Sequence, residues 1–176
     1  MGNGQLKPGF NLQHGVDAEY ITWLSIGPQP TDTTTLIPFL KEAEEYLEFK
    51  YSKVVADAGY ESEENYLFLE KNGQTAFIKP ANYEISKKRK YQNDIGRIEN
   101  MNYDETKDSY TCKNEKELSL ASIRHSKSKT GYVSEKHIYQ CADCKGCPYK
   151  SECIKGNNCK TPMEKRNKVL WVAKPF

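Results

Sequence analysis

The order of helix and strand patterns between residues 31 and 80 constrains the fold more than any other feature. Residues 31–47, TDTTTLIPFLKEAEEYL, place apolar side chains at the spacing of one helix face. A short apolar run, KVVADAG, follows at 53–59, then a second helix pattern at 62–73 and a second short run, TAFIKP, at 75–80. Short apolar strands joined by a helix are typical of parallel strands in a layered fold. The sequence therefore predicts a mixed α/β fold in which these two runs pair in parallel.

Polar side chains mark the expected starts of the two helices. Asp32 or Thr33 is placed to cap the first helix, and Ser62 is placed to cap the second. Glu63 and Glu64 suit the positive end of the second helix dipole. We expect both helices to begin directly after these caps.

A hairpin pattern precedes the first helix. In FNLQHGVD, residues 10–17, Phe10, Leu12, His14 and Val16 alternate with polar residues and glycine, which is the period of a half-buried strand. The run YITWLSIG at 20–27 follows after a short polar link. The two runs predict an antiparallel hairpin with the apolar set facing inward, and His14 is expected to be a sheet residue rather than a ligand.

The run KVVADAG ends in a carboxylate, Asp57, directly before a residue pair that lets the backbone turn. Ligand sites in open α/β sheets lie at the carboxyl ends of strands, so Asp57 is a candidate metal ligand. A local Asx-turn explains one isolated aspartate about as well. Both interpretations stay open at this point.

Charge is distributed unevenly along the chain. Residues 1–78 contain 5 Lys/Arg against 12 Asp/Glu, whereas residues 79–176 contain 21 against 12. A basic second part suits a polyanion such as DNA, although a solvated lysine-rich face fits the same counts. Tyrosines interleaved with these cations, at positions 83, 91, 103, 110 and 132, could stack on unpaired bases, although a single tyrosine is more often a packing residue. The candidate DNA-binding residues are Lys87, Lys88, Arg89, Lys90, Arg124, Lys127 and Lys129, with Arg97 and Lys136 in the same basic set.

Five of the six cysteines fall within residues 141–159. The run CADCKGCPYKSEC repeats the Cys-x-x-Cys step, which lets thiolates converge on one ion. This predicts a zinc site, with an iron–sulfur cluster or free thiols as alternatives. The expected ligands are Cys141, Cys144, Cys147 and Cys153, and Cys112, Cys159 or His137 could replace one of them.

The character of the sequence changes near Pro80. We expect residues 1–80 to form one α/β part and residues 81–176 a basic, β-rich, cysteine-containing insertion, with hairpins turning near Asn114 and at 129–131. No apolar stretch approaches the ~20 residues of a membrane span, and the N-terminal residues lack the apolar core of a signal peptide. A cytoplasmic location is the expectation.

Several segments carry a resemblance when taken together. They are LKPGFNLQHGVDAEYI, TLIPFLKEAEEYL, VVADAGYESEENYLFLEKNGQTAFIKPANYE, DIGRIENMNYD and SKSKTGYVSEKHIYQCADCKGCPYKSECIKGNN. In this order they resemble the central part of the DDE transposases of bacterial insertion sequences. The resemblance extends to about Arg166, and the tail NKVLWVAKPF departs from it.

The resemblance implies an RNase H-like fold and a triad of two aspartates and a glutamate that bind two Mg²⁺ ions. One ion would activate a water or a 3′-hydroxyl and the other would stabilise the leaving oxygen of a DNA phosphodiester. Asp57 matches the second aspartate. The first aspartate would precede Met1 and the glutamate would follow residue 176, whereas Glu99 and Glu164 do not match the glutamate motif.

These departures make the enzymatic activity of this chain an open question. We expect a transposase fragment that is inactive alone and that meets transposon-end DNA and other transposase chains. The strand with the first aspartate would lie between the hairpin and the parallel strands, so its absence would leave two sheet edges unpaired. The alternative is a stand-alone zinc- and DNA-binding module that regulates transposition.

Overall fold

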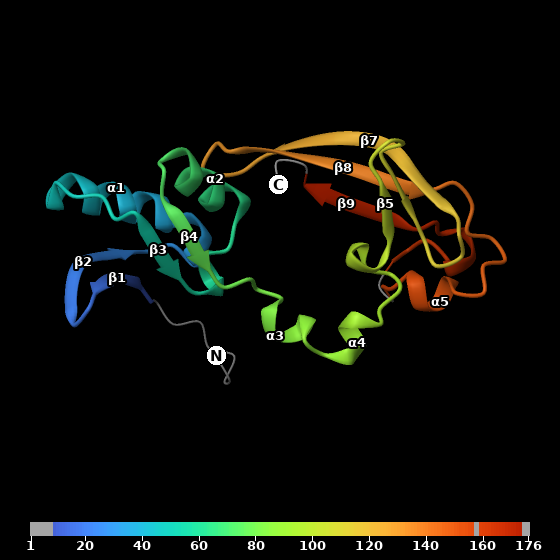
Figure 1. The fold of residues 1–176 in the computed structure, drawn as a ribbon, viewed down its shortest axis with the longest axis horizontal. Coiled ribbons are helices and arrows are strands. Elements are labelled where there is room, and N and C mark those ends of the chain that lie inside the picture. Colours follow the sequence, from blue (N-terminus) through green and yellow to red (C-terminus); the bar gives the residue numbers. More distant parts are fainter. Residues whose placement is uncertain (1–8, 157–158, 174–176) are drawn as a thin grey trace. The chain divides into compact units, whose positions relative to one another are not determined.

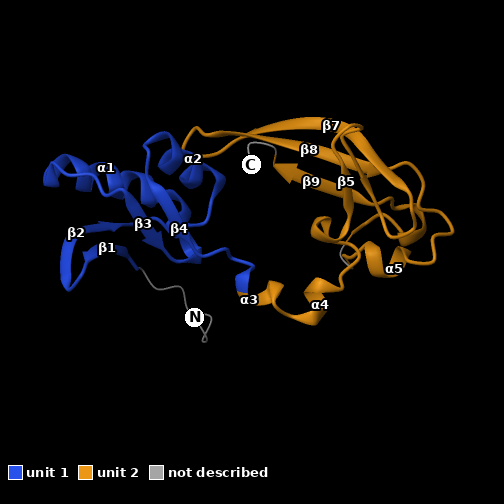
Figure 2. Cartoon of the chain, in the orientation of Figure 1, with its two compact units in different colours: residues 1–83 blue, residues 84–176 orange. Residues whose placement is uncertain are grey.

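A computed structural model describes residues 9–156 and 159–173 of the chain. The chain divides into two compact units, residues 1–83 and residues 84–176 (Figure 2). The mixed α/β fold class is confirmed. None of the helices in the described ranges is long and apolar enough to cross a membrane.

Unit 1 contains two small sheets and two main helices (Figure 1). Its elements in chain order are β1 (Asn11–Asp17), β2 (Tyr20–Gly27), α1 (Leu36–Leu47), β3 (Lys53–Ala56), α2 (Glu63–Lys71) and β4 (Thr75–Ile78), with 3₁₀ turns η1 (Asp32–Thr34) and η2 (Ala58–Tyr60). The predicted hairpin is confirmed, because β1 and β2 pair antiparallel. The predicted parallel pair is confirmed as well, in β3 and β4. Among the described residues the two pairs form separate sheets rather than one continuous mixed sheet.

The buried face of the hairpin is opposite to the predicted one. Gln13 is buried, and its Nε2 donates to Thr35 Oγ1 at 2.6 Å. Trp23, opposite Gly15 in the ladder, stacks on Tyr46 of α1 with 5.0 Å between ring centroids. Helix α1 therefore covers the face of β1 that carries Gln13. The apolar alternate residues, among them Leu12 at 55% exposure, have no covering element in the described part of the chain.

The start of α2 follows its prediction, and the start of α1 does not. Ser62 Oγ accepts from the backbone N–H of Asn65 at 3.2 Å, as expected of a helix cap. Asp32 and Thr33 lie inside η1, so Thr35 occupies the cap position of α1 and makes no side-chain capping hydrogen bond. A 3₁₀ turn before the helix removes the geometry that a side-chain cap needs.

A buried amide links three segments of unit 1. Asn65 is fully buried on α2, and its Nδ2 donates to the carbonyl of Tyr60 at 2.7 Å and to the carbonyl of Thr33 at 3.2 Å. It thereby holds η1 and η2 against the first turn of α2. The small apolar core beside it consists of Leu36, Leu69 and Ile78.

Unit 2 is an antiparallel sheet with short helices. Its elements are α3 (Tyr83–Ser86, which begins at the last residue of unit 1), α4 (Arg89–Gln92), β5 (Asn102–Asp104), β6 (Ser109–Thr111), β7 (Glu117–Lys127), β8 (Val133–Cys141), α5 (Lys150–Cys153) and β9 (Val169–Ala173), with 3₁₀ turns at Ile98–Asn100 and Met163–Lys165. The strand order is β5-β6-β7-β8-β9. The predicted β-rich character and both predicted hairpin turns are confirmed.

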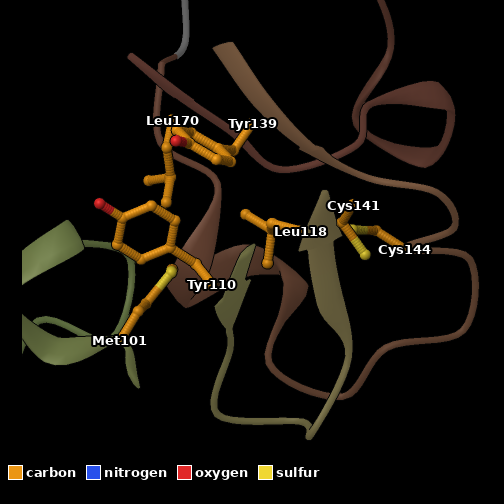
Figure 3. Packing of buried hydrophobic residues seen from close by; sticks show 7 residues of the cluster. All are labelled: Met101, Tyr110, Leu118, Tyr139, Cys141, Cys144 and Leu170. Carbon is orange, nitrogen blue, oxygen red and sulfur yellow. The ribbon is translucent and has the colours of Figure 1, made fainter. Parts of the chain in front are cut away.

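The core of unit 2 is built from both ends of its sequence (Figure 3). It contains Met101, Tyr110, Leu118, Tyr139, Cys141, Cys144 and Leu170. Leu170 comes from β9, which pairs with β8 along residues 169–173. Residues 169–173 of the tail that departs from the family resemblance therefore form an edge strand that contributes Leu170 to the core.

We predict that Asn65→Ala lowers the free energy of unfolding of unit 1 by about 1–3 kcal/mol, because it leaves the carbonyls of Tyr60 and Thr33 without that donor. Urea unfolding followed by Trp23 fluorescence measures this in a Trp171→Phe background, which silences the tryptophan of unit 2.

Asn72→Ala is the matched control for that variant. Its Nδ2 donates to the carbonyl of Phe68, which also accepts the backbone N–H of Asn72. The carbonyl of Phe68 keeps a donor in this variant, so the free energy of unfolding should fall by less than in Asn65→Ala. Equal losses in the two variants would contradict the bridging role of Asn65.

Candidate functional site

Asp57 lies directly after β3, at its carboxyl end, and is exposed. Its Oδ1 accepts from the backbone N–H of Gly59 at 2.7 Å, so the side chain caps η2. This is the Asx-type geometry that the sequence left open as an alternative. The hydrogen bond uses one carboxylate oxygen, and Oδ2 can still accept a ligand.

A second carboxylate, which the sequence pattern indicated only as a helix cap, lies beside the first. A Cβ atom at Gly59 would come within 2.8 Å of Asp32 Oδ2 and 3.0 Å of Asp57 Oδ1. A methyl group at this position would push the two carboxylates aside. The structure thus brings Asp32 and Asp57 together around Gly59.

Hydrogen bonds and nearby charges define the surroundings of this pair. Asn11 Nδ2 donates to Asp32 Oδ1 at 2.6 Å, which ties the start of β1 to η1. Burial, then the charges of Asp32 and Asp57, raise the pKa of the Tyr60 phenol. A negative field therefore extends over this end of β3, and a cation would relieve it.

The sequence indicated Asp32 only as a candidate cap of the first helix. It precedes a helix, where aspartate is common as a cap, so nothing in the pattern linked it to a residue 25 positions later. Gly59 was a usable signal, because a glycine two residues after a candidate ligand marks close approach of other groups.

The thiols of unit 2 surround one small cavity. Its volume is about 20 Å³, and the cysteines that line it are Cys112, Cys141, Cys144, Cys147 and Cys153. The sulfurs of Cys141 and Cys144 lie next to each other in the core (Figure 3). Burial, then the neighbouring Cys144 thiol, raise the pKa of Cys141 to about 11.

The two remaining candidate thiol-site ligands lie elsewhere. Cys159 is exposed, and its pKa is lowered by hydrogen bonds with Thr161. His137 lies on β8, where its Nε2 is 2.7 Å from Glu135 Oε1. Of the three alternative ligands, Cys112 is the one that lines the cavity, and it lies in the connection between β6 and β7.

As they stand, no three His, Cys, Asp or Glu side chains within residues 9–156 and 159–173 are close enough together to hold a metal ion. The chemistry of the thiols suits zinc, but their spacing does not form a finished site. The two carboxylates around Gly59 are likewise fewer than a magnesium ion needs. Neither metal site is complete in the described residues.

The candidate DNA-binding residues occupy two segments of unit 2. Lys87, Lys88, Arg89 and Lys90 are all exposed around α3 and α4. Arg124, Lys127 and Lys129 are exposed on β7 and the turn after it. The guanidinium of Arg124 lies over the ring of Trp171, 5.4 Å from its centroid.

Part of the expected aromatic and basic set is structural. Tyr91 is buried, its hydroxyl donates to Glu99 Oε1 at 2.9 Å, and the guanidinium of Arg97 lies 3.5 Å from its ring centroid. Tyr110 is buried in the core. Of the two alternatives for these rings, packing is therefore the correct one, because both are buried against other side chains. Tyr83 and Tyr103 stay partly exposed.

A comparison with known protein families identifies the family of this chain. The family described as "Transposase DDE domain" matches residues 1–167. The chain belongs to the DDE transposase family. The match covers both units, and only the last residues of the chain lie beyond it. Searches of curated proteins and of solved structures found no match.

Membership in the family supports a function in transposition and implies DNA as a partner and divalent metal ions as cofactors. Asp57 is the residue of this chain that the resemblance assigns to metal. Its exposed position at a strand end, beside a second carboxylate, suits that assignment. The described residues supply only part of the site that these ions need.

Proposed function

We propose that this chain supplies part of the catalytic core of a DDE transposase, which cleaves DNA and transfers strands. The family match over residues 1–167 is the observation that carries the proposal. It also speaks against a stand-alone binding module, because the match includes unit 1 with Asp57. The family's two Mg²⁺ ions, when bound, supply a nucleophile and stabilise the leaving oxygen.

Within this proposal, Asp57 is the metal-binding carboxylate of the chain. The Gly59 N–H fixes one of its oxygens, so the other is held in a defined direction at the end of β3. Asp32 adds negative charge on the other side of Gly59. The pair attracts a divalent ion without completing its octahedral shell.

The chain alone is therefore proposed to be inactive. With supercoiled plasmid DNA and Mg²⁺ or Mn²⁺, we expect no more nicked product from the chain than from its Asp57→Ala variant. Metal-dependent nicking that disappears in Asp57→Ala would overturn the proposed inactivity.

A second arm of that experiment tests the function itself. The chain is co-expressed with the polypeptide segments encoded on either side of its reading frame. Cleavage that needs those segments and is lost in Asp57→Ala supports the transposase assignment. Cleavage that is unchanged in Asp57→Ala contradicts the role given to this carboxylate.

Contact with DNA is assigned to the exposed cations of unit 2. Lysine and arginine pair with phosphates and give affinity without reading sequence. Exposure of the two basic segments supports this role, and a cytoplasmic chain would meet chromosomal DNA directly. The residues are Lys87, Lys88, Arg89, Lys90, Arg124, Lys127 and Lys129.

Zinc is proposed as the structural metal of unit 2. Five thiols around one cavity support it, although they would have to draw together to form a tetrahedron. A buried thiol beside another has a raised pKa, as at Cys141, and a bound cation would reverse that effect. Zinc binding must then displace protons and weaken as the pH falls.

We predict one zinc ion per chain in protein purified without chelator, measured by mass spectrometry of the metal. Cys144→Ser should lower the zinc content strongly, and Cys159→Ser, which changes an exposed thiol outside the cavity, should leave it unchanged. Equal zinc in all three proteins would remove Cys144 from the site. Visible absorbance in anaerobic protein would favour an iron–sulfur cluster, because Zn²⁺ is colourless.

A further inference from the structure

Lys168 contacts the cavity that five cysteines of unit 2 line, and it does so with both its backbone and its side chain. We call this cavity the thiol cavity. Lys168 directly precedes β9, and its carbonyl accepts from the backbone N–H of Cys141 at 3.0 Å, which continues the pairing of β8 with β9. Its own backbone N–H donates to the sulfur of Cys144 at 3.4 Å. The residue before β9 therefore holds one cysteine by its backbone and another by its sulfur.

The ammonium group of Lys168 reaches a third cysteine. Its Nζ donates to the carbonyl of Gly96 at 2.5 Å and to the carbonyl of Cys153 at 3.2 Å. Cys153 is the last residue of α5, whereas Cys141 ends β8 and Cys144 lies in the turn that follows. A single residue thus joins the two segments that carry these three thiols.

Asn167 holds the turn between Cys141 and Cys144 from the same side. Its Oδ1 accepts from the backbone N–H of Cys144 at 3.1 Å, and its Nδ2 donates to the carbonyl of Ala142 at 2.9 Å. The rotamers open to a side chain depend on its backbone. Asn167 and Lys168 together therefore set the direction of the Cys144 sulfur.

The cavity wall beside Cys153 is closely packed. A Cβ atom at Gly96 would collide with the carbonyl oxygen of Cys153, which is a backbone atom and cannot rotate away as a side chain does. The neighbouring Ile95 lines the thiol cavity. The carbonyl of Cys153 is therefore confined between the Lys168 ammonium and the backbone of Gly96.

The charge of Lys168 has a second effect on the thiols. Burial raises the pKa of the Cys153 thiol, and the positive charge of Lys168 opposes this rise. A zinc ion with four thiolates carries a net negative charge, and a buried charge is costly unless it is paired. Lys168 is half-buried at the cavity, so its ammonium is placed to compensate such a centre.

We propose that Lys168 is the positioning residue of the thiol site. It is not a metal ligand. Its backbone sets the turn that carries Cys144, and its ammonium links Cys153 to that turn and compensates the negative charge of a metal–thiolate centre. This role rests on the zinc site proposed above, and it belongs to a residue just past the family match, which ends at residue 167.

The test uses the full chain, reduced and freed of metal, with Co²⁺ as the probe. Cobalt bound to thiolates absorbs visible light, and the bands report a tetrahedral site, whereas zinc is colourless. Lys168→Met removes the ammonium and keeps the backbone. We expect it to bind Co²⁺ about tenfold or more weakly than the unsubstituted chain, with altered visible bands, because outer-shell groups typically contribute that much. Lys165→Met, which changes an exposed lysine outside the cavity, should bind normally.

Lys168→Arg keeps the positive charge and hydrogen-bond donors, so it should recover most of the lost affinity. Equal affinity and equal bands in Lys168→Met and the unsubstituted chain would overturn the proposal. Equal weakening in Lys168→Met and Lys168→Arg would overturn it too, because the charge would then have no part in binding.

Gly96→Ala tests the opposite side of Cys153. The added methyl group would push the Cys153 carbonyl out of its place beside Lys168, so Co²⁺ should bind more weakly. Gly9→Ala is the control, because its methyl group would meet no atom within 4 Å. Normal Co²⁺ binding in Gly96→Ala would contradict the link between Lys168 and Cys153.

Hydrogen exchange of the β8 and β9 amides shows whether each variant keeps its fold. If Lys168→Met loses that protection, Lys168→Gln, which keeps a donor without the charge, replaces it in the comparison. Loss of protection in both variants would make Lys168 a residue of the fold alone and overturn its role at the thiols. Absence of Co²⁺ uptake by the unsubstituted chain would overturn the zinc site and this role together. Uptake that all Lys168 variants share equally would overturn the role and leave the zinc site standing.

Discussion

The buried amide of Asn65 is the contact on which the arrangement of unit 1 depends. It joins the first turn of α2 to the carbonyls of Tyr60 and Thr33. These carbonyls belong to the two 3₁₀ turns that carry Asp57 and Asp32 at their beginnings. Because a buried donor has strict geometric needs, one side chain fixes the distance between two acidic turns.

Unit 1 also contains a cavity beside these turns. Residues of β1 and β3 line a cavity of about 470 Å³, and large apolar side chains of these strands lie exposed. Isolated two-stranded sheets are marginal on their own. Packing on α1 and the hydrogen bonds from Gln13 and Asn11 hold them in place. The acidic pair is therefore built on two small sheets whose stability depends on these contacts.

Local patterns along the chain predicted much of this fold. The parallel strands, the hairpins and the Ser62 cap follow from spacing and residue type, which act over a few positions. The inward face of β1 could not be predicted in that way. Alternation shows that a strand has two different faces, but which face α1 covers depends on Gln13 meeting Thr35, a contact between distant residues.

The site was predictable to the same extent. Asp57 follows from its place at a strand end, and the cysteine run from its spacing. Asp32 required knowledge that η1 lies against η2, and Cys112 required the fold of β6 and β7 around the cavity. The tail strand β9 is short and lies past the family match, and no feature of the sequence linked it to β8.

The central claim is that Asp57 and Asp32 form an incomplete site for a divalent ion around Gly59. A titration of the ¹⁵N-labelled chain with Mn²⁺, observed by NMR, tests this claim most directly. We predict weak binding in which paramagnetic broadening begins at Gly59 and its neighbours and is lost in Asp57→Asn. Broadening that begins in unit 2, or that persists unchanged in Asp57→Asn, would contradict the claim.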